Sequence, residues 1–137
     1  MSIWQLHFDG GAVPNPGMAT CGFVAHWMEG EVKPENPVIE KTWALPGTKT
    51  NNDAEYDAAV RGIETIVETD ADVKEIIVYG DSQLVVNQLA GNWKIKNKKF
   101  LPYKMKVDSI RERVTVRFRH IPREYNEHAD FLTRVVR

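Results

Sequence analysis

Cysteine is almost absent from this chain of 137 residues, which contains only Cys21. A single cysteine cannot form an internal disulfide, so we expect a reducing, cytoplasmic setting. No apolar run approaches the length of a membrane span, and the first residues show neither a basic region nor a small-residue cleavage site. We therefore expect no membrane partner and no secretory signal. The length and the 42% hydrophobic content predict one soluble domain over residues 1–137, and we expect a monomer.

Basic residues are scarce in the first part of the chain, and acidic residues are scarce in the last part. Residues 1–90 contain 5 Lys or Arg and 14 Asp or Glu, a net charge of −9, whereas residues 91–137 contain 13 and 5, a net charge of +8. Such segregation favours a cation-binding pole and a polyanion-binding pole on one body. Solvated helix surface would give the same pattern, so charge alone leaves both interpretations open.

Hydrophobic periodicity predicts an α/β fold. Strands are expected over residues 3–9, 20–28, 38–45, 75–80 and 114–120. Helices are expected over residues 52–68, with Asn51 or Asn52 as N-cap, over 82–90 and 100–113, and from about residue 126. A polar loop is expected over residues 29–37. The first three strands follow one another directly, which is typical of an antiparallel meander, whereas helices separate the later strands, which implies parallel neighbours with right-handed crossovers.

Four acidic residues follow strands or lie near helix starts, namely Asp9, Glu55, Asp81 and Asp130. Asp9 and Asp81 are expected at the carboxyl ends of adjacent parallel strands, the edge where open α/β sheets bind ligands. Glu55 and Asp130, on helices, could reach the same edge. Converging carboxylates repel one another and normally need cations, so the pattern indicates a divalent-metal site and phosphoryl-transfer chemistry. Read one at a time, each acid also has a plain explanation as a helix-dipole, cap or surface residue.

The motifs around these acids resemble those of the type 1 ribonuclease H family. They are Asp9-Gly10-Gly11-Ala12 with Pro14-Asn15-Pro16-Gly17, Thr50-Asn51-Asn52-Asp53-Ala54-Glu55, Asp81-Ser82-Gln83 and Asn126-Glu127-His128-Ala129-Asp130. Each motif alone is weak, whereas all four in family order over nearly the whole chain are specific. The resemblance implies a ribonuclease H-like mixed sheet of five strands in the order 3-2-1-4-5, flanked by helices. It also implies an endonuclease that hydrolyses the RNA strand of RNA–DNA hybrids, leaving 5′-phosphate and 3′-hydroxyl ends.

The resemblance assigns roles to particular residues. The family's catalytic, metal-binding carboxylates correspond to Asp9, Glu55, Asp81 and Asp130, which implies two Mg²⁺ ions bridged by Asp9, with Mn²⁺ as a substitute. The expected contacts with the RNA strand are Gly10, Gly11, Ala12, Asn15, Asn51, Asn52 and Gln83. Backbone and amide groups of this kind can read a 2′-hydroxyl in the minor groove with little sequence preference.

The DNA strand is expected on the basic segment, residues 93–99. There Trp93 offers a flat ring, and Lys94 and Lys96 offer phosphate-binding ammonium groups. Thr50 is a further candidate phosphate contact. A solvated lysine-rich loop with Trp93 packed inward is the alternative.

The chain departs from the family in two places. The basic stretch is shorter than in many bacterial members, which predicts weaker binding of hybrids. The segment before the last acid lacks glycine, and neither His120 nor His128 matches the histidine of the family cleanly. Arg123 or Glu124 could serve in its place, and Arg123 is also a candidate substrate contact.

Three other functions stay open. A non-catalytic module that binds hybrids or duplex RNA would share the fold, although intact carboxylates argue against it. A 3′ exonuclease or transposase-type domain would share the acids but lack the set Asn15, Asn51 and Gln83. A structural or small-ligand-binding protein would leave the acids on its surface.

Overall fold

The computed structural model describes residues 2–28 and 38–135, and the loop expected over residues 29–37 lies outside this range. The strands are β1 (Ser2–Val13), β2 (Met18–Met28), β3 (Val38–Ala44), β4 (Val73–Gly80) and β5 (Thr115–His120). The helices are α1 (Asn51–Thr69), α2 (Gln83–Ala90), α3 (Leu101–Arg111) and α4 (Glu127–Val135), with short 3-10 turns η1 (Lys98–Phe100) and η2 (Arg123–Tyr125). No helix within the described ranges combines the length and the apolar character that crossing a membrane requires.

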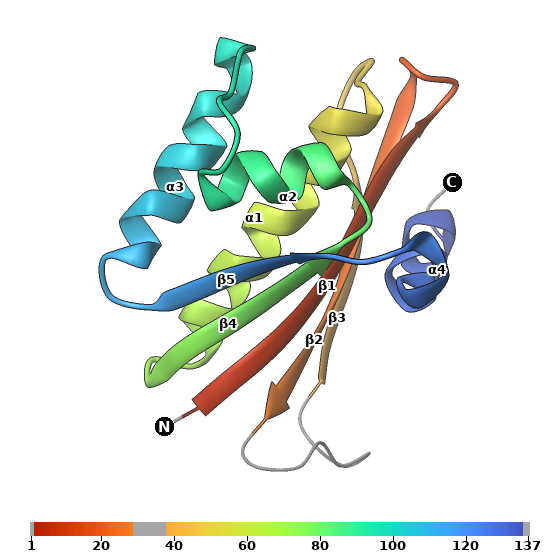
Figure 1. The fold of residues 1–137 in the computed structure, drawn as a ribbon. Coiled ribbons are helices and arrows are strands. Elements are labelled where there is room, and N and C mark those ends of the chain that lie inside the picture. Colours follow the sequence, from red (N-terminus) through yellow and green to blue (C-terminus); the bar gives the residue numbers. More distant parts are fainter. Residues whose placement is uncertain (1, 29–37, 136–137) are drawn as a thin grey trace.

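The strands form one mixed sheet in the order β3-β2-β1-β4-β5, which confirms the predicted topology (Figure 1). The pairs β3–β2 and β2–β1 are antiparallel, and the pairs β1–β4 and β4–β5 are parallel. Helices separate the parallel strands in sequence because a parallel pair needs a long crossover, and α1 to α3 supply these crossovers.

The first strand is longer than predicted. It continues past Asp9 to Val13, because residues 9–13 pair with residues 18–22 of β2. The parallel pairing with β4 ends earlier, at His7 and Tyr79. Asp9 therefore lies inside an antiparallel ribbon, just beyond the last parallel pair, and not at a strand end. It still reaches the predicted edge of the sheet, since β4 stops at Gly80 and Asp81 follows directly.

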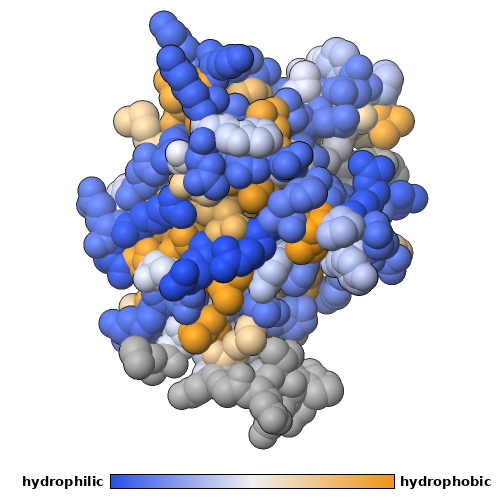
Figure 2. All heavy atoms as spheres, in the orientation of Figure 1, coloured by the Kyte–Doolittle hydropathy of each residue, from blue (hydrophilic) through white to orange (hydrophobic). Residues whose placement is uncertain are grey.

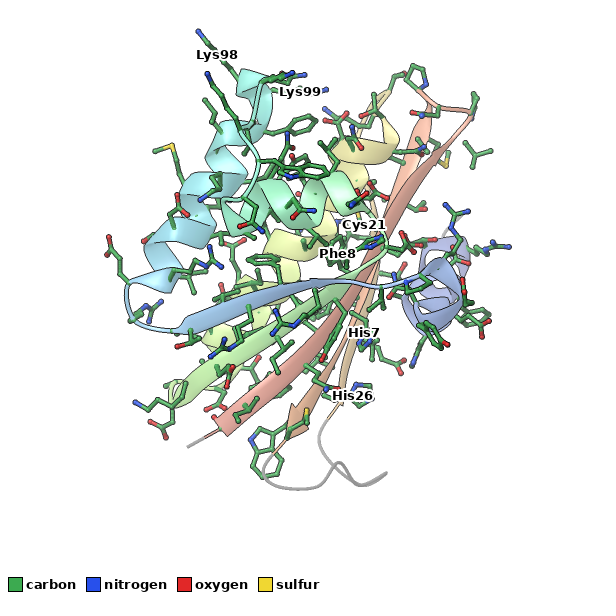
Figure 3. The ribbon with its side chains drawn as sticks, in the orientation of Figure 1. His7, Phe8, Cys21, His26, Lys98 and Lys99 are labelled. Carbon is green, nitrogen blue, oxygen red and sulfur yellow. The ribbon has the colours of Figure 1, made fainter. Side chains whose placement is uncertain are left out.

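The two faces of the sheet are covered by different helices. Helices α1 to α3 lie on one face and α4 lies on the other (Figure 1). Leu6 and Phe8 of β1 are buried on the α1 side, and each such side chain contributes about 1.5–3 kcal/mol when fully buried. Figure 3 places Phe8 and Cys21 on this side, and His7 and His26 on the opposite side near α4.

The N-cap of α1 is Thr50, one residue before Asn51 and two before Asn52, the two predicted caps. Thr50 has extended backbone angles, and its hydroxyl accepts a hydrogen bond from the Asp53 N–H at 3.2 Å. The Asp53 carboxylate accepts from the Thr50 N–H at 2.8 Å, which completes a capping box. The prediction of Asn51 or Asn52 as N-cap is thus wrong, because the Asn51 side chain bonds to the Ala12 N–H instead.

Candidate functional site

Three carboxylates meet where β1 separates from β4. Asp9 comes from β1, Glu55 from the start of α1 and Asp81 from the residue after β4, and one oxygen from each lies within 4.8 Å of the others. Asp9 is buried, whereas Glu55 and Asp81 are half-buried. The predicted convergence of these three acids on one point is therefore confirmed.

Glycine at position 10 allows α1 to approach β1 closely. A Cβ atom on Gly10 would lie 2.4 Å from the carbonyl carbon of Ala54 and 2.6 Å from the nitrogen of Glu55. Real side chains do not approach backbone so closely, so the missing side chain brings Glu55 against the strand that carries Asp9. The structure thus gives Gly10 a packing role, and its contact with substrate stays a prediction.

Asp130 stands beside this cluster. Its carboxyl group faces Asp9 from α4, because both a hydrogen bond between the two groups and the Asp130 charge raise the pKa of Asp9. Asp130 Oδ2 also pairs with Arg134 Nη2 at 3.1 Å, one turn further along α4. All four predicted acids therefore face one region, with three in a tight group and Asp130 next to Asp9.

Burial and mutual repulsion perturb the acids. Burial, followed by the charge of Asp81, the hydrogen bond and charge of Asp130 and the charge of Glu55, raises the pKa of Asp9 to about 8. Burial and the charge of Asp81 raise the pKa of Glu55 to about 7, although a hydrogen bond from Ser82 and the charge of Arg123 oppose this rise. Such carboxyl groups retain protons near neutral pH unless a cation replaces them. The all-oxygen donor set fits a divalent metal ion.

The residues expected to contact RNA lie near the start of α1, and several are bonded to one another. The Asn51 N–H donates to Asn15 Oδ1 at 3.1 Å, and the Ala12 N–H donates to Asn51 Oδ1 at 2.7 Å. Ala12 is buried, Gly11 is half-buried and Gln83 is exposed. The bonds hold the β1–β2 hairpin against α1, and any contact of these residues with RNA stays a prediction.

The residues expected to contact DNA lie in an exposed groove. The groove has a volume of about 580 Å³, and its lining includes Asn52, Trp93, Lys94 and Lys96. Trp93 is 44% exposed, so the alternative of an inward-packed tryptophan is wrong. In Figure 2 hydrophilic side chains project from the end of the molecule where Figure 3 labels Lys98 and Lys99. The predicted RNA-side residue Asn52 thus shares one groove with the predicted DNA-side residues.

Comparisons with known proteins identify the family to which this chain belongs. Residues 7–136 match the model of the family described as reverse transcriptase-like. Ribonuclease HI of Halobacterium salinarum is 33% identical over 138 aligned positions, and the match covers 93% of this chain and 61% of that protein. The solved structure of LC11-RNase H1 in complex with an RNA/DNA hybrid is 33% identical, with a TM-score of 0.81, and the match covers 96% of this chain and 94% of that chain. The chain belongs to the type 1 ribonuclease H family.

Some ribonuclease H relatives are much longer than this chain. The bifunctional protein Rv2228c of Mycobacterium tuberculosis is 32% identical over 128 residues, and the match covers only 33% of its length. The solved N-terminal ribonuclease H domain of that protein superposes with a TM-score of 0.82 at 29% identity and covers 98% of this chain. The chain thus spans about a third to three fifths of the curated relatives it matches, the part that forms the ribonuclease H fold.

The two histidines that could stand for the ribonuclease H histidine have different surroundings. His128 Nε2 lies 2.9 Å from Glu40 Oε1 of β3, and His120 is exposed at the end of β5. Arg123 in η2 instead faces the site, since its charge acts to lower the pKa of Glu55. Glu124 is exposed. The role of Arg123 in place of the histidine stays a prediction, now with a position that permits it.

Asn126 is a site residue that the spacing of acids does not reveal. Its side chain is buried, and Nδ2 donates to the Phe8 carbonyl at 2.8 Å and to Asp81 Oδ2 at 3.2 Å. Its own carbonyl accepts the Asp130 N–H at 3.1 Å. One residue therefore links the backbone next to Asp9, the Asp81 carboxylate and the helix of Asp130. The sequence feature that could have identified Asn126 is its position four residues before Asp130 in a motif of the family.

Ser82 is a second residue absent from the predicted site. Its hydroxyl donates to Glu55, and its oxygen accepts the Val85 N–H at 3.3 Å as the N-cap of α2. One hydroxyl therefore orients an acid of the cluster and starts the helix that leads to the basic segment. The sequence feature that could have identified Ser82 is its place directly after Asp81 and directly before an apolar helix.

Replacing Asn126 by alanine is expected to lower the cleavage rate about 10- to 100-fold, because residues that orient metal ligands typically have effects of this size. The rate would be measured on an RNA–DNA hybrid at saturating Mg²⁺. Thr133→Val is the matched control, since Thr133 is buried in α4, the helix that directly follows Asn126, and donates to the Asp130 carbonyl at 2.7 Å without touching a carboxylate. Equal activity losses in the two variants would assign the effect to general loosening of α4.

Proposed function

We propose that this chain is the catalytic domain of a ribonuclease H, an endonuclease that hydrolyses the RNA strand of RNA–DNA hybrids. The convergence of Asp9, Glu55 and Asp81 within 4.8 Å, beside an exposed basic groove, carries the proposal. Membership of the type 1 ribonuclease H family supports it, as does a relative that was solved with an RNA/DNA hybrid. We further propose that residues 1–137 act as one domain, as a monomer, in the cytoplasm.

We propose that Asp9, Glu55, Asp81 and Asp130 would hold two Mg²⁺ ions as cofactors, with Mn²⁺ as a substitute. Two such ions, when bound, supply an activated water and stabilise the leaving 3′ oxygen. The raised pKa values of Asp9 and Glu55 support this assignment, because cations would relieve the repulsion that otherwise favours protonation.

The protein's own residues supply the positions for hydrolysis. Asp9 and Asp81 extend from adjacent strands, so their separation is set by the sheet. Ser82 holds the Glu55 carboxylate and Asn126 holds Asp81. The Arg123 guanidinium brings a positive charge to the Glu55 side of the site, where it would attract a phosphate of the RNA strand. Cleavage would leave a 5′-phosphate and a 3′-hydroxyl.

The two strands of the substrate would occupy different elements. We place the RNA strand on the hairpin and the start of α1, where Gly11, Asn15, Asn51 and Gln83 can approach 2′-hydroxyls. We place the DNA strand on Trp93, Lys94 and Lys96. The groove that Asn52 shares with these three residues supports simultaneous contact with both strands. Contacts with sugars and phosphates predict little sequence preference and strong salt dependence.

Cleavage of four substrates tests the proposal: an RNA–DNA hybrid, duplex RNA, duplex DNA and single-stranded RNA, each with Mg²⁺ and with a chelator. We expect metal-dependent cutting of the RNA strand of the hybrid and little cutting of the others. Equal cutting of single-stranded RNA would reject the proposal. Tight binding of hybrid without any cutting would favour a non-catalytic binding module instead.

A further inference from the structure

Asp57 is a buried carboxylate that joins three elements close to the acidic group. Its Oδ2 atom accepts from Trp43 Nε1 of β3 at 2.7 Å and lies 3.1 Å from Arg61 Nε. Its Oδ1 atom accepts from the Tyr103 hydroxyl of α3 at 3.0 Å. Burial, followed by the charge of Asp57 and this hydrogen bond, raises the pKa of Tyr103, so the phenol stays a donor. A carboxylate bonded in this way holds β3, α1 and α3 together.

Two further contacts continue this connection along α1. Phe100 stacks on Tyr56 with ring centroids 4.3 Å apart, and Lys99 Nζ lies 3.1 Å from Asp53 Oδ1. Asp53, Tyr56 and Asp57 share one side of α1, because residues three and four apart are neighbours on a helix surface. We call the three pairs Asp53–Lys99, Tyr56–Phe100 and Asp57–Tyr103 the α1–α3 ladder.

The ladder begins at the last residue of the basic segment, Lys99, and continues to Phe100 and Tyr103. The segment leaves α2 at Gly91, whose left-handed φ of 89° suits glycine. Gln88 Nε2 then donates to the Lys94 carbonyl at 3.0 Å. The segment is therefore held by α2 at its beginning and by the ladder at its end. Because Asp53 and Asp57 flank Glu55 on α1, the same ladder connects the basic segment to the helix that supplies an acid of the site.

We propose that the Tyr103–Asp57 hydrogen bond is a positioning contact that sets the separation between the basic segment and the acidic site. This inference rests on the proposed function. A duplex must contact both parts at once, whereas a single strand can adapt to either part alone. A fixed separation lowers the cost of binding for duplexes that match it, because no loop has to be ordered on binding. Tyr103 itself touches no substrate in this scheme.

The Tyr103→Phe variant removes the hydroxyl and leaves Asp57 Oδ1 buried without this donor, so α3 loses its bond to α1. The Trp43→Phe variant removes the other neutral donor to Asp57 and leaves α3 bonded. It is the harsher change, since it also deletes part of a ring over which Arg61 lies at 5.5 Å. Any effect specific to Tyr103→Phe therefore cannot arise from lost stability alone.

We expect Tyr103→Phe to raise KM for the hybrid about three- to tenfold and to change kcat less than about twofold. This pattern is expected when a variant binds its substrate more weakly but still carries out the chemical step. Trp43→Phe should lower Tm at least as much and leave KM within about twofold of the parent. Binding is measured separately by fluorescence anisotropy in the Asp81→Asn background. There Tyr103→Phe should raise Kd for the hybrid by the same factor and leave Kd for single-stranded DNA unchanged.

An unchanged KM and Kd in Tyr103→Phe, or equal shifts in both variants, would overturn the positioning role. So would a parallel loss of affinity for single-stranded DNA. If the parent binds but does not cut the hybrid, the proposed function fails, and the Kd comparison still decides the positioning role. If the parent cuts the hybrid and Tyr103→Phe behaves like it, only the positioning role fails.

Discussion

Hybrid cleavage should fall about a thousandfold or more when Asp9 is replaced by asparagine. The carboxylates of Glu55, Asp81 and Asp130 all act on Asp9, which makes it the centre of the cluster. Asparagine keeps the shape and removes the charge that Asp9 would provide as the proposed metal ligand. Bound metal supplies several kcal/mol of transition-state stabilisation, and each 1.36 kcal/mol corresponds to about tenfold in rate. The measurement is kcat on a hybrid at saturating Mg²⁺.

The matched control is Asp108→Asn. Asp108 is an exposed carboxylate on α3 that pairs with Lys104. The same loss of one negative charge there should leave kcat within about twofold of the parent, because exposed ion pairs contribute little. A ratio of the two variants' kcat values near one would show that charge at Asp9 does not matter for hydrolysis, and the metal assignment would fail with it.

The arrangement of the sheet was open to prediction because it follows from local patterns and general topology rules. Alternation along residues 3–9 and the apolar run over residues 75–80 identify two strands, and the helices between them make the strands parallel. The end of the first strand was not predictable in this way. Its extension to Val13 depends on pairing with β2, and a Gly-Gly sequence gives no strand signal of its own.

The acids of the site were predictable, whereas the residues that hold them were not. Glu55, Asp81 and Asp130 lie close to the ends of local elements, and Asp9 lies just beyond the last parallel pair of β1 and β4, so their positions follow once the elements are known. Asn126 donates a hydrogen bond to the Phe8 carbonyl, 118 residues away in sequence. Asp57 accepts a hydrogen bond from Tyr103, 46 residues away in sequence. From the sequence alone, Asp57 resembles an acidic residue on the solvated face of a helix. Such contacts depend on tertiary packing, which spacing along the chain does not specify.

Asp9→Asn should also stabilise the metal-free protein at pH 8, in contrast to its effect on activity. In the unfolded chain Asp9 loses its proton near its ordinary pKa of 3.8, whereas in the folded protein its pKa is about 8. The folded state therefore binds more protons between these values, and its stability falls as pH rises through them. Glu55 acts in the same direction up to its folded pKa of about 7.

The window for this test is pH 6.5 to 8, because His7 opposes the acids at lower pH. Burial, followed by the charges of His26 and His128, lowers the pKa of His7 from 6.5 to about 4, so its contribution to stability is lost as pH falls below 6.5. Above pH 6.5, Asp9 and Glu55 dominate the pH dependence of the folding stability among these three groups. A slope of about 1.4 kcal/mol per pH unit for one retained proton predicts a loss of about 2 kcal/mol over this window.

Chemical denaturation with a chelator at pH 6.5 and pH 8 measures this loss for the parent, Asp9→Asn and Asp108→Asn. The parent and Asp108→Asn should lose stability as pH rises, whereas Asp9→Asn should lose much less. Mg²⁺ should restore the parent at pH 8, because a ligand that binds only the folded state raises its stability. At pH 8 the parent would then need Mg²⁺ to reach its full stability, whereas Asp9→Asn would be stable without the metal. A parent whose stability stays level across this pH range would contradict the electrostatic strain inferred for the acidic group, because crowded carboxylates cannot lose protons without cost.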